Sequence, residues 1–331
     1  GLDDFLDRDL GIGSLERVEL LLRLEEVFGV RLADAVMAEA ETPRDLARAV
    51  VSAAPAVPER IHEALPPLAS AARLPASAAT LVDVLRRHAE ADPARVHIFL
   101  RDESGSEQPI TYGGLLERAD RVAAGLAEHG IARGQSVGLM LRTEAAFFEV
   151  FFGTLLAGGV PVPIYPPFRM DRIEEYARRQ AGILRNAQVR LLITFAGVER
   201  LGRLLRARVP TLGEVTSVER LAASGARPPA LSLGGGSPAL IQYTSGSTGE
   251  PKGVLLSHAN ILANIRAIGE ALAIRPDDVA VSWLPLYHDM GLIGSWLGSL
   301  YFGIPIAILA PQAFLSRPAR WLRTVHAHRG T

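Results

Sequence analysis

The sequence predicts an α/β protein with a largely parallel sheet, preceded by a small all-helical unit. Three observations lead to this prediction. Strand-like and helix-like segments alternate from residue 79 onwards, which is typical of parallel strands joined by helices. Residues 1–53 carry helical periodicity, and residues 54–78 are rich in alanine and proline, as linkers are. We therefore expect a small unit over 1–53, a linker over 54–78 and a large α/β unit over 79–331.

The first unit is expected to contain two helices. Ser14 can cap a helix whose apolar positions continue to Phe28, and Gly29 follows as a stop signal. A second helix begins at Thr42 and Pro43, because proline is favoured at the first helical position.

Helices and strands are expected to alternate in the large unit as far as residue 194. Helices are expected over 81–90, 112–129, 144–156 and 171–186, and strands over 96–100, 136–141, 160–164 and 191–194. Further on we expect strands over 240–243 and 279–283, a helix that begins after Ser257, and a last helix over 321–328. Residues 290–312 carry no charge, but their glycines and proline predict a buried helix followed by a strand, not a membrane span.

Composition excludes several classes of function. Hydrophobic residues make up 48% and charged residues 21%, an ordinary balance for a globular protein. The net charge of −1 gives no general electrostatic basis for binding nucleic acid or an anionic membrane. The chain has no cysteine, so disulfides, thiolate metal sites and a cysteine nucleophile are excluded, and a reducing cytoplasm is the expected location. The acidic start is unlike a signal peptide, and Gly1 indicates a piece of a longer protein.

Charge is distributed unevenly between the two units. Residues 1–50 hold 12 Asp or Glu and 6 Lys or Arg, a net charge of −6, and the remaining residues hold 24 and 29, a net charge of +5. An acidic small unit joined to a mildly basic large one predicts two modules with different partners.

The segment from Tyr243 to Asn260, YTSGSTGEPKGVLLSHAN, is the most informative part of the chain. Glycine N–H groups, hydroxyls and a lysine charge together suit the β- and γ-phosphates of ATP; the alternative is a flexible loop without a ligand. It is not the common P-loop, because Pro251 precedes Lys252 and Gly253 follows it. The candidate phosphate-binding residues are Thr244, Ser245, Gly246, Ser247, Thr248, Gly249 and Lys252.

This segment resembles the phosphate-binding signature of the acyl-adenylate-forming superfamily, which includes acyl-CoA synthetases, luciferases and the adenylation domains of peptide synthetases. The resemblance implies an N-terminal part of a large adenylate-forming ligase domain that uses ATP with Mg²⁺. It also implies that Thr244, Ser245, Ser247, Thr248 and Lys252 surround the leaving pyrophosphate.

A second segment, WLPLYHDMGL over 283–292, follows an expected strand. His288 therefore lies at a strand's carboxyl end, where ligands bind in open α/β sheets, although a lone histidine is more often structural. The superfamily has a histidine or aromatic residue here that faces the acyl carboxylate, which implies a catalytic role for His288. The expected acid-side residues are Tyr287, His288, Asp289, Met290 and Gly291.

The same segment, with PVPIYPP at 161–167 and the helix at 174–187, is most similar to fatty acyl-AMP ligases. Amino-acid-activating domains usually carry a Phe-Asp pair here, the Asp holding the amine. Tyr287 and His288 stand in that region instead, which favours a fatty acid over an amino acid.

The start of the chain carries a third motif, DLGIGSL over 9–15, which resembles the attachment site of acyl-carrier proteins. The resemblance implies that a phosphopantetheinyl transferase places 4′-phosphopantetheine on Ser14, and that the acidic helix after it docks on basic partner enzymes. Acyl carriers generally have Asp before this serine, whereas this chain has Gly13. In the alternative interpretation Ser14 is only a helix cap.

Together these resemblances imply a partial carrier helical bundle in front of a ligase that converts a fatty acid and ATP to acyl-AMP and passes the acyl group to a pantetheine thiol on a carrier. Polyketide or peptide synthetase modules are the implied partners. The alternatives are an acyl-CoA synthetase, a loading module for another acid, or a carrier with a vestigial ligase half. The family's adenosine-binding regions and catalytic lysine come after the last residue here, so residues 1–331 alone are expected to be inactive.

Overall fold

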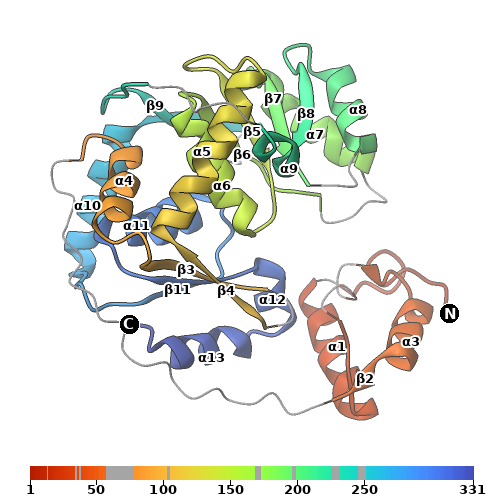
Figure 1. Ribbon diagram of the computed structural model, residues 1–331. Helices are drawn as coiled ribbons and strands as arrows, with labels where there is room; N and C mark the ends of the chain where they lie inside the picture. The colour runs from red at the N-terminus through yellow and green to blue at the C-terminus, as the bar shows by residue number, and fades with distance from the viewer. Residues whose placement is uncertain are drawn as a thin grey trace.

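The computed structural model describes residues 1–12, 14–33, 36, 39–56, 78–102, 105–167, 173–195, 199–224, 231–244 and 251–331. Side chains are described for these residues apart from 14–16 and 199–200. Figure 1 shows the small N-terminal unit beside the large unit.

Helices and a short strand pair build the described part of the N-terminal unit (Figure 1). The elements are α1 (Ser14–Phe28), β1 (Val30–Arg31), α3 (Pro43–Ser52) and β2 (Ala54–Pro55). Both helices begin where the sequence predicted, and their apolar sides meet around the buried Leu6 and Leu46. β1 and β2 pair antiparallel, which was not predicted because two-residue strands are too short to show an alternating pattern.

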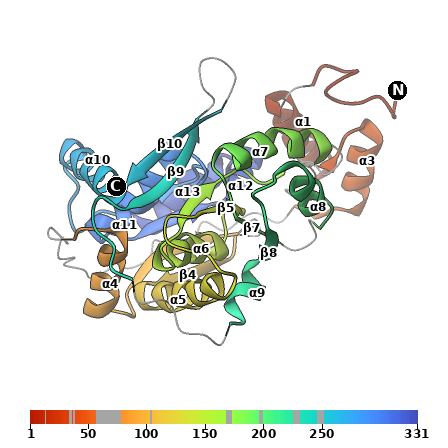
Figure 2. The ribbon, with the colours of Figure 1, turned by 90° about the horizontal axis from the view of Figure 1, so that it is seen from above.

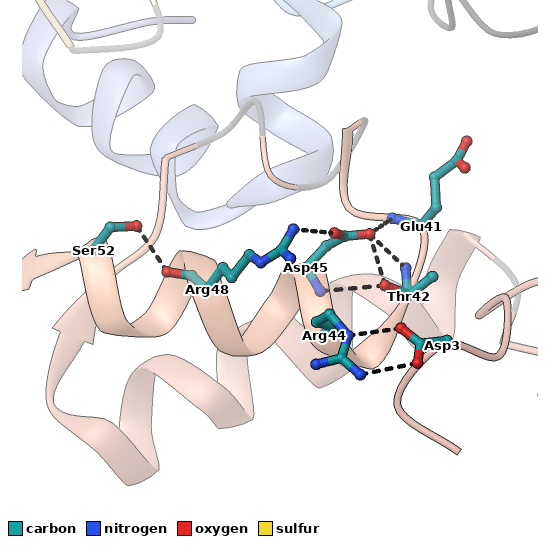
Figure 3. Close-up of polar contacts among 7 residues, drawn as sticks. All are labelled: Asp3, Glu41, Thr42, Arg44, Asp45, Arg48 and Ser52. Carbon is teal, nitrogen blue, oxygen red and sulfur yellow. Dashed lines mark hydrogen bonds and ion pairs between the residues drawn. The ribbon is translucent and has the colours of Figure 1, made fainter.

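Polar contacts among nearby side chains stabilise the start of α3 (Figure 3). Thr42 Oγ1 accepts a hydrogen bond from Asp45 N at 3.3 Å, and Asp45 Oδ2 accepts one from Thr42 N at 3.0 Å, which forms a capping box. The Thr42 hydroxyl also donates to Asp45 Oδ2 at 2.8 Å; this hydrogen bond, and after it those from the backbone N–H groups of Thr42 and Glu41, lower the pKa of the Asp45 carboxyl. Arg44 donates to both carboxylate oxygens of Asp3 at 2.6 and 2.9 Å and so ties the chain start to the helix.

The large unit contains two four-stranded sheets and a two-stranded hairpin. The first sheet, ordered β11-β12-β3-β4, consists of β11 (Ala280–Ser282), β12 (Ile306–Leu309), β3 (Val96–Arg101) and β4 (Glu107–Thr111). The second, ordered β6-β5-β7-β8, consists of β6 (Val160–Pro163), β5 (Ser136–Met140), β7 (Leu191–Thr194) and β8 (Glu214–Ser217). The second sheet is entirely parallel, and only β4 is antiparallel in the first, so the predicted α/β class with largely parallel sheets is confirmed.

Helices form layers around these sheets (Figures 1 and 2). The helices of the large unit are α4 (Leu81–Ala91), α5 (Tyr112–Glu128), α6 (Ala145–Leu156), α7 (Ile173–Asn186), α8 (Glu199–Arg208), α9 (Val218–Ala222), α10 (His258–Leu272), η1 (Met290–Leu297), α11 (Gly298–Phe302), α12 (Pro311–Ser316) and α13 (Ala319–His328). The main core joins α4, α5, α6 and η1 with inward-facing residues of both sheets, so these helices lie between the sheets. A second core covers the other face of the β6-β5-β7-β8 sheet with α7 and α8.

The uncharged run over 290–312 is buried at the centre of this arrangement. Trp296 is fully buried, and its ring lies 4.8–6.2 Å from those of Phe147, Phe148, Phe151 and Phe152 on α6. The expected buried helix and strand are confirmed as η1 with α11 and as β12, although the first part is a π-helix where an ordinary helix was expected. None of the described helices is long and apolar enough to cross a membrane.

Candidate functional site

A β-hairpin holds both ends of the predicted phosphate loop. β9 (Pro238–Thr244) pairs antiparallel with β10 (Lys252–Ser257), and Thr244 lies opposite Lys252 in the register. β10 was not predicted as a strand; cross-strand pairing with β9 overrides the turn signals of Pro251 and Gly253. The other predicted loop residues lie outside the described residues: Ser245, Gly246, Ser247, Thr248 and Gly249.

The base of this loop is fixed by a tyrosine that covers a glycine. Tyr243 and Gly253 are cross-strand partners, and a Cβ atom on Gly253 would lie 2.9 Å from the Tyr243 ring. The Tyr243 hydroxyl donates to Asn186 Oδ1 at the end of α7. Gly253 therefore allows the ring to cross the hairpin and anchor it to the neighbouring helix.

Lys252 is the only lysine in the chain, since the other 34 of its 35 basic residues are arginines. Its side chain is exposed at the start of β10, directly after the loop. Arginine serves every other cationic position, so a general preference for lysine does not explain this one. A lysine ammonium is compact and can approach an anion such as a phosphate as a point charge.

The acid-side loop runs from the end of β11 into η1. His288 Nδ1 lies 2.7 Å from Asp289 Oδ1, and the same oxygen accepts a hydrogen bond from Met290 N at 2.7 Å. The carboxylate thus contacts the Nδ1 side of the imidazole, and Nε2 lies on the other side of the ring. The His288 side chain is 65% exposed, so the ring is reachable from solvent.

Gly291 lets η1 fold back tightly on this loop. A Cβ atom at Gly291 would lie 2.3 Å from Pro285 O and 2.9 Å from Leu284 O, both backbone atoms. Ser295 Oγ donates to Met290 O at 3.1 Å, five residues earlier, along the wide turn of the π-helix. Such π-helical turns are frequent at functional sites.

One buried side chain connects the two loops. Gln242 is 5% exposed, and its Nε2 donates to Tyr287 O at 2.9 Å. It lies on β9 two residues before Thr244, so a single hydrogen bond joins the strand that leads into the phosphate loop to the backbone beside His288. Gln242 was not predicted from the sequence, although an amide directly after the apolar run 239–241 is an unusual feature of a buried strand.

A group of tyrosines lies beside the acid-side loop. The Tyr165 ring, just beyond β6, lies 6.1 Å from the Tyr287 ring and 5.4 Å from the Tyr176 ring. Burial, and to a smaller degree the nearby Tyr165, raises the pKa of Tyr287 and raises that of Tyr176 further. The Tyr176 and Tyr287 phenols therefore stay protonated at neutral pH, and the three rings provide a largely apolar wall.

The predicted attachment serine begins α1, as the sequence indicated. Gly13 and the Ser14 side chain are outside the part of the chain that the structure describes. Among the described residues, no group of His, Asp and Glu side chains is arranged to hold a metal ion.

Two mostly parallel sheets, a hairpin at both ends of the predicted phosphate loop and a further loop at a strand end are the arrangement expected of an adenylate-forming ligase domain. The chain belongs to the AMP-binding enzyme family, whose model matches residues 85–331. The model described as phosphopantetheine attachment site matches residues 1–50.

Individual relatives agree with this assignment. The chain is 32% identical over 260 residues to a medium-chain-fatty-acid–acyl-carrier-protein ligase of Moorena producens, which covers 76% of this chain and 43% of that protein. A solved structure from structural and functional studies of fatty acyl-adenylate ligases from E. coli and L. pneumophila gives a TM-score of 0.71 with 32% identity, over 77% of this chain and 46% of that one. The L. pneumophila ligase in complex with acyl adenylate and pyrophosphate gives a TM-score of 0.67 with 30% identity, over 76% of this chain and 43% of the other. The chain therefore spans less than half the length of these proteins.

Proposed function

We propose that the protein of which this chain is part activates a fatty acid with ATP. The acid's carboxylate attacks the α-phosphorus, which gives acyl-AMP and pyrophosphate, and the acyl group then passes to a phosphopantetheine thiol on a carrier. The observation that carries the proposal is the Gln242–Tyr287 hydrogen bond, because it holds the phosphate hairpin and the acid-side loop against each other. A reaction between two bound substrates depends on this kind of alignment.

Each part of the site has a role in this reaction. Thr244 and Lys252 lie where the hairpin presents the phosphate loop, and Lys252 supplies positive charge for the pyrophosphate that leaves. His288, oriented by Asp289, faces the carboxylate of the acid. The Tyr165 and Tyr287 rings offer apolar surface against which an acyl chain can pack.

The cofactors follow from the same chemistry. ATP enters such reactions as its Mg²⁺ complex, and Mg²⁺ binds substrate phosphates with few protein ligands. We assign residues 1–53 to a partial carrier, 54–78 to a linker and 79–331 to the ligase part; the two family matches support this division. Ser14 at the start of α1 is the residue that would carry 4′-phosphopantetheine, attached by a phosphopantetheinyl transferase. A cytoplasmic location, where ATP and CoA are supplied, fits this use.

The acceptor of the acyl group is the finer part of the proposal. The relatives named above include a ligase that acts with an acyl-carrier protein, and a carrier-type segment precedes the ligase part of this chain. Both favour a carrier-bound thiol of a polyketide or peptide synthetase over free CoA.

The single lysine allows a direct test of the phosphate site on this chain. An amine-reactive ester modifies Lys252 and the terminal amine of Gly1, and peptide mass spectrometry reports the two separately. We expect millimolar pyrophosphate or MgATP to slow modification of Lys252 at least fivefold and to leave Gly1 unchanged. Sulfate at equal ionic strength is the control for general screening, and Lys252→Arg identifies the peptide. Equal rates for Lys252 with and without pyrophosphate would contradict the assignment.

A further inference from the structure

An ion pair joins the N-terminal unit to the large unit. Arg317 Nη2 donates to Glu25 Oε1 on α1 and to Leu32 O at 3.4 Å, and Glu25 Oε1 also accepts the N–H of Leu32 at 2.7 Å. Figure 1 shows α12 beside α1 at this point. The contact therefore includes a side chain and the backbone of the small unit, bound by one guanidinium.

This pair differs in its burial from the Arg23–Glu19 ion pair of the same helix. The Arg317 and Glu25 side chains are 11% and 14% exposed, whereas Arg23 and Glu19 are 72% and 63% exposed. A largely buried ion pair persists only when further hydrogen bonds satisfy its atoms, and Leu32 supplies both an acceptor and a donor. These features are typical of an interface, not of a chance contact between exposed surfaces.

The surface of the large unit is held by helix and ring contacts at this point. Arg317 ends α12, and its backbone N–H donates to Phe314 O at 3.1 Å. The Phe314 ring stacks on Trp283 at 3.8 Å with planes only 7° apart. Trp283 follows β11 and opens the acid-side loop, so the contacted helix is packed directly against the proposed site.

The charges of the two surfaces are complementary. Residues 290–331 include four arginines and no Asp or Glu: Arg317, Arg320, Arg323 and Arg329. Residues 1–50 have 12 acidic and 6 basic side chains, a net charge of −6. Opposite net charges on two tethered units favour their encounter and set its orientation.

We infer that α12 and Arg317 form a docking surface for the acidic N-terminal unit of the same chain, with Glu25 as its anchor. The contact uses the C-terminal part of α1. Ser14 begins this helix 11 residues before Glu25, or roughly 16 Å along the axis at about 1.5 Å per residue. Docking therefore engages the end of α1 remote from the attachment serine. This docking is a binding contact between the two units and does not require the enzymatic reaction to take place.

Carbodiimide cross-linking of Arg317→Lys tests this surface while keeping the positive charge. Carbodiimide joins a carboxylate to an amine without a spacer, and the chain has only one other lysine. We expect an amide link between Glu25 and the amine introduced at position 317, identified by mass spectrometry in a monomer, with a yield unchanged on tenfold dilution. Adding Glu25→Gln should abolish this cross-linked peptide. Arg44→Lys is the matched control, because Asp3 should link to it within the N-terminal unit irrespective of docking.

Two outcomes would overturn the inference. One is the absence of the Glu25 link in Arg317→Lys when the Asp3 link forms in Arg44→Lys; the other is a link that appears only between two chains. Charge reversal gives a second measurement without chemical modification. Glu25→Arg and Arg317→Glu should each increase the radius of gyration in small-angle scattering, and the double variant should restore it. Equal radii for all four proteins would also overturn the inference.

Discussion

Replacing Gly291 by alanine should disturb the acid-side loop, and the structure sets the size of the effect. The added Cβ would lie 2.3 Å from Pro285 O, whereas ordinary contacts lie at 3.4–4 Å. The backbone of η1 and the loop must therefore separate by about 1 Å. Overpacking of this kind lowers the free energy of unfolding by about 1–3 kcal/mol. Alanine offsets about 0.5–1 kcal/mol of this loss, because it loses less backbone entropy than glycine on folding.

The same helix offers a matched control. A Cβ on Gly294 has no atom within 4 Å, so Gly294→Ala should only gain the entropic term. Calorimetry should show Tm lowered by about 2–8 °C for Gly291→Ala and raised by about 1–3 °C for Gly294→Ala. In the full-length protein, acyl-AMP formation should fall about 10- to 100-fold for Gly291→Ala and stay within about twofold for Gly294→Ala, because alignment at the site tolerates little displacement. Equal effects of the two substitutions on both Tm and rate would refute the reasoning.

Three further predictions concern other parts of the molecule. Gln242→Leu removes the hydrogen bond to the acid-side loop, so acyl-AMP formation by the full-length protein should fall about tenfold. Because the substitution also removes the buried Gln242 Oε1, which has no hydrogen-bond partner, Tm should change by less than about 4 °C. Ser14→Ala should abolish the pantetheine mass that a phosphopantetheinyl transferase and CoA add to the chain. Burial lowers the pKa of His88 and His258 from 6.5 to about 4 and that of His97 to about 3. Between pH 6.5 and 4 the unfolded chain then binds more protons than the folded chain. The free energy of unfolding should therefore fall as the pH is lowered through that window, by up to about 1.4 kcal/mol per pH unit for each histidine. In urea titrations at pH 7.5 and 5, His97→Phe should reduce the loss of stability at the lower pH.

Features set by local patterns were predictable from the sequence. The helix α10 begins after Ser257, whose Oγ accepts from Asn260 N at 3.2 Å, as its capping pattern indicated. Three strands of the parallel sheet, β5, β6 and β7, were predicted because their residues form short apolar runs between helical segments, whereas β8, which has no such run, was not predicted. The position of His288 after a strand followed from the same patterns.

Features set by contacts between distant residues could not be predicted in this way. The pairing that makes β10 a strand depends on β9, and the role of Gln242 depends on Tyr287, 45 residues later. The π-helical form of η1 depends on the close approach of Gly291 to Pro285, which no periodicity records. A buried amide within an apolar strand was the one local sign that such a contact existed.

The most direct test of the proposed function is acid-dependent exchange of labelled pyrophosphate into ATP by the full-length protein. This exchange reports reversible acyl-AMP formation and needs neither the carrier nor CoA. We expect medium- and long-chain fatty acids to support exchange, amino acids not to support it, and Lys252→Ala to reduce it at least tenfold. Exchange that is faster with any amino acid than with every fatty acid would contradict the account.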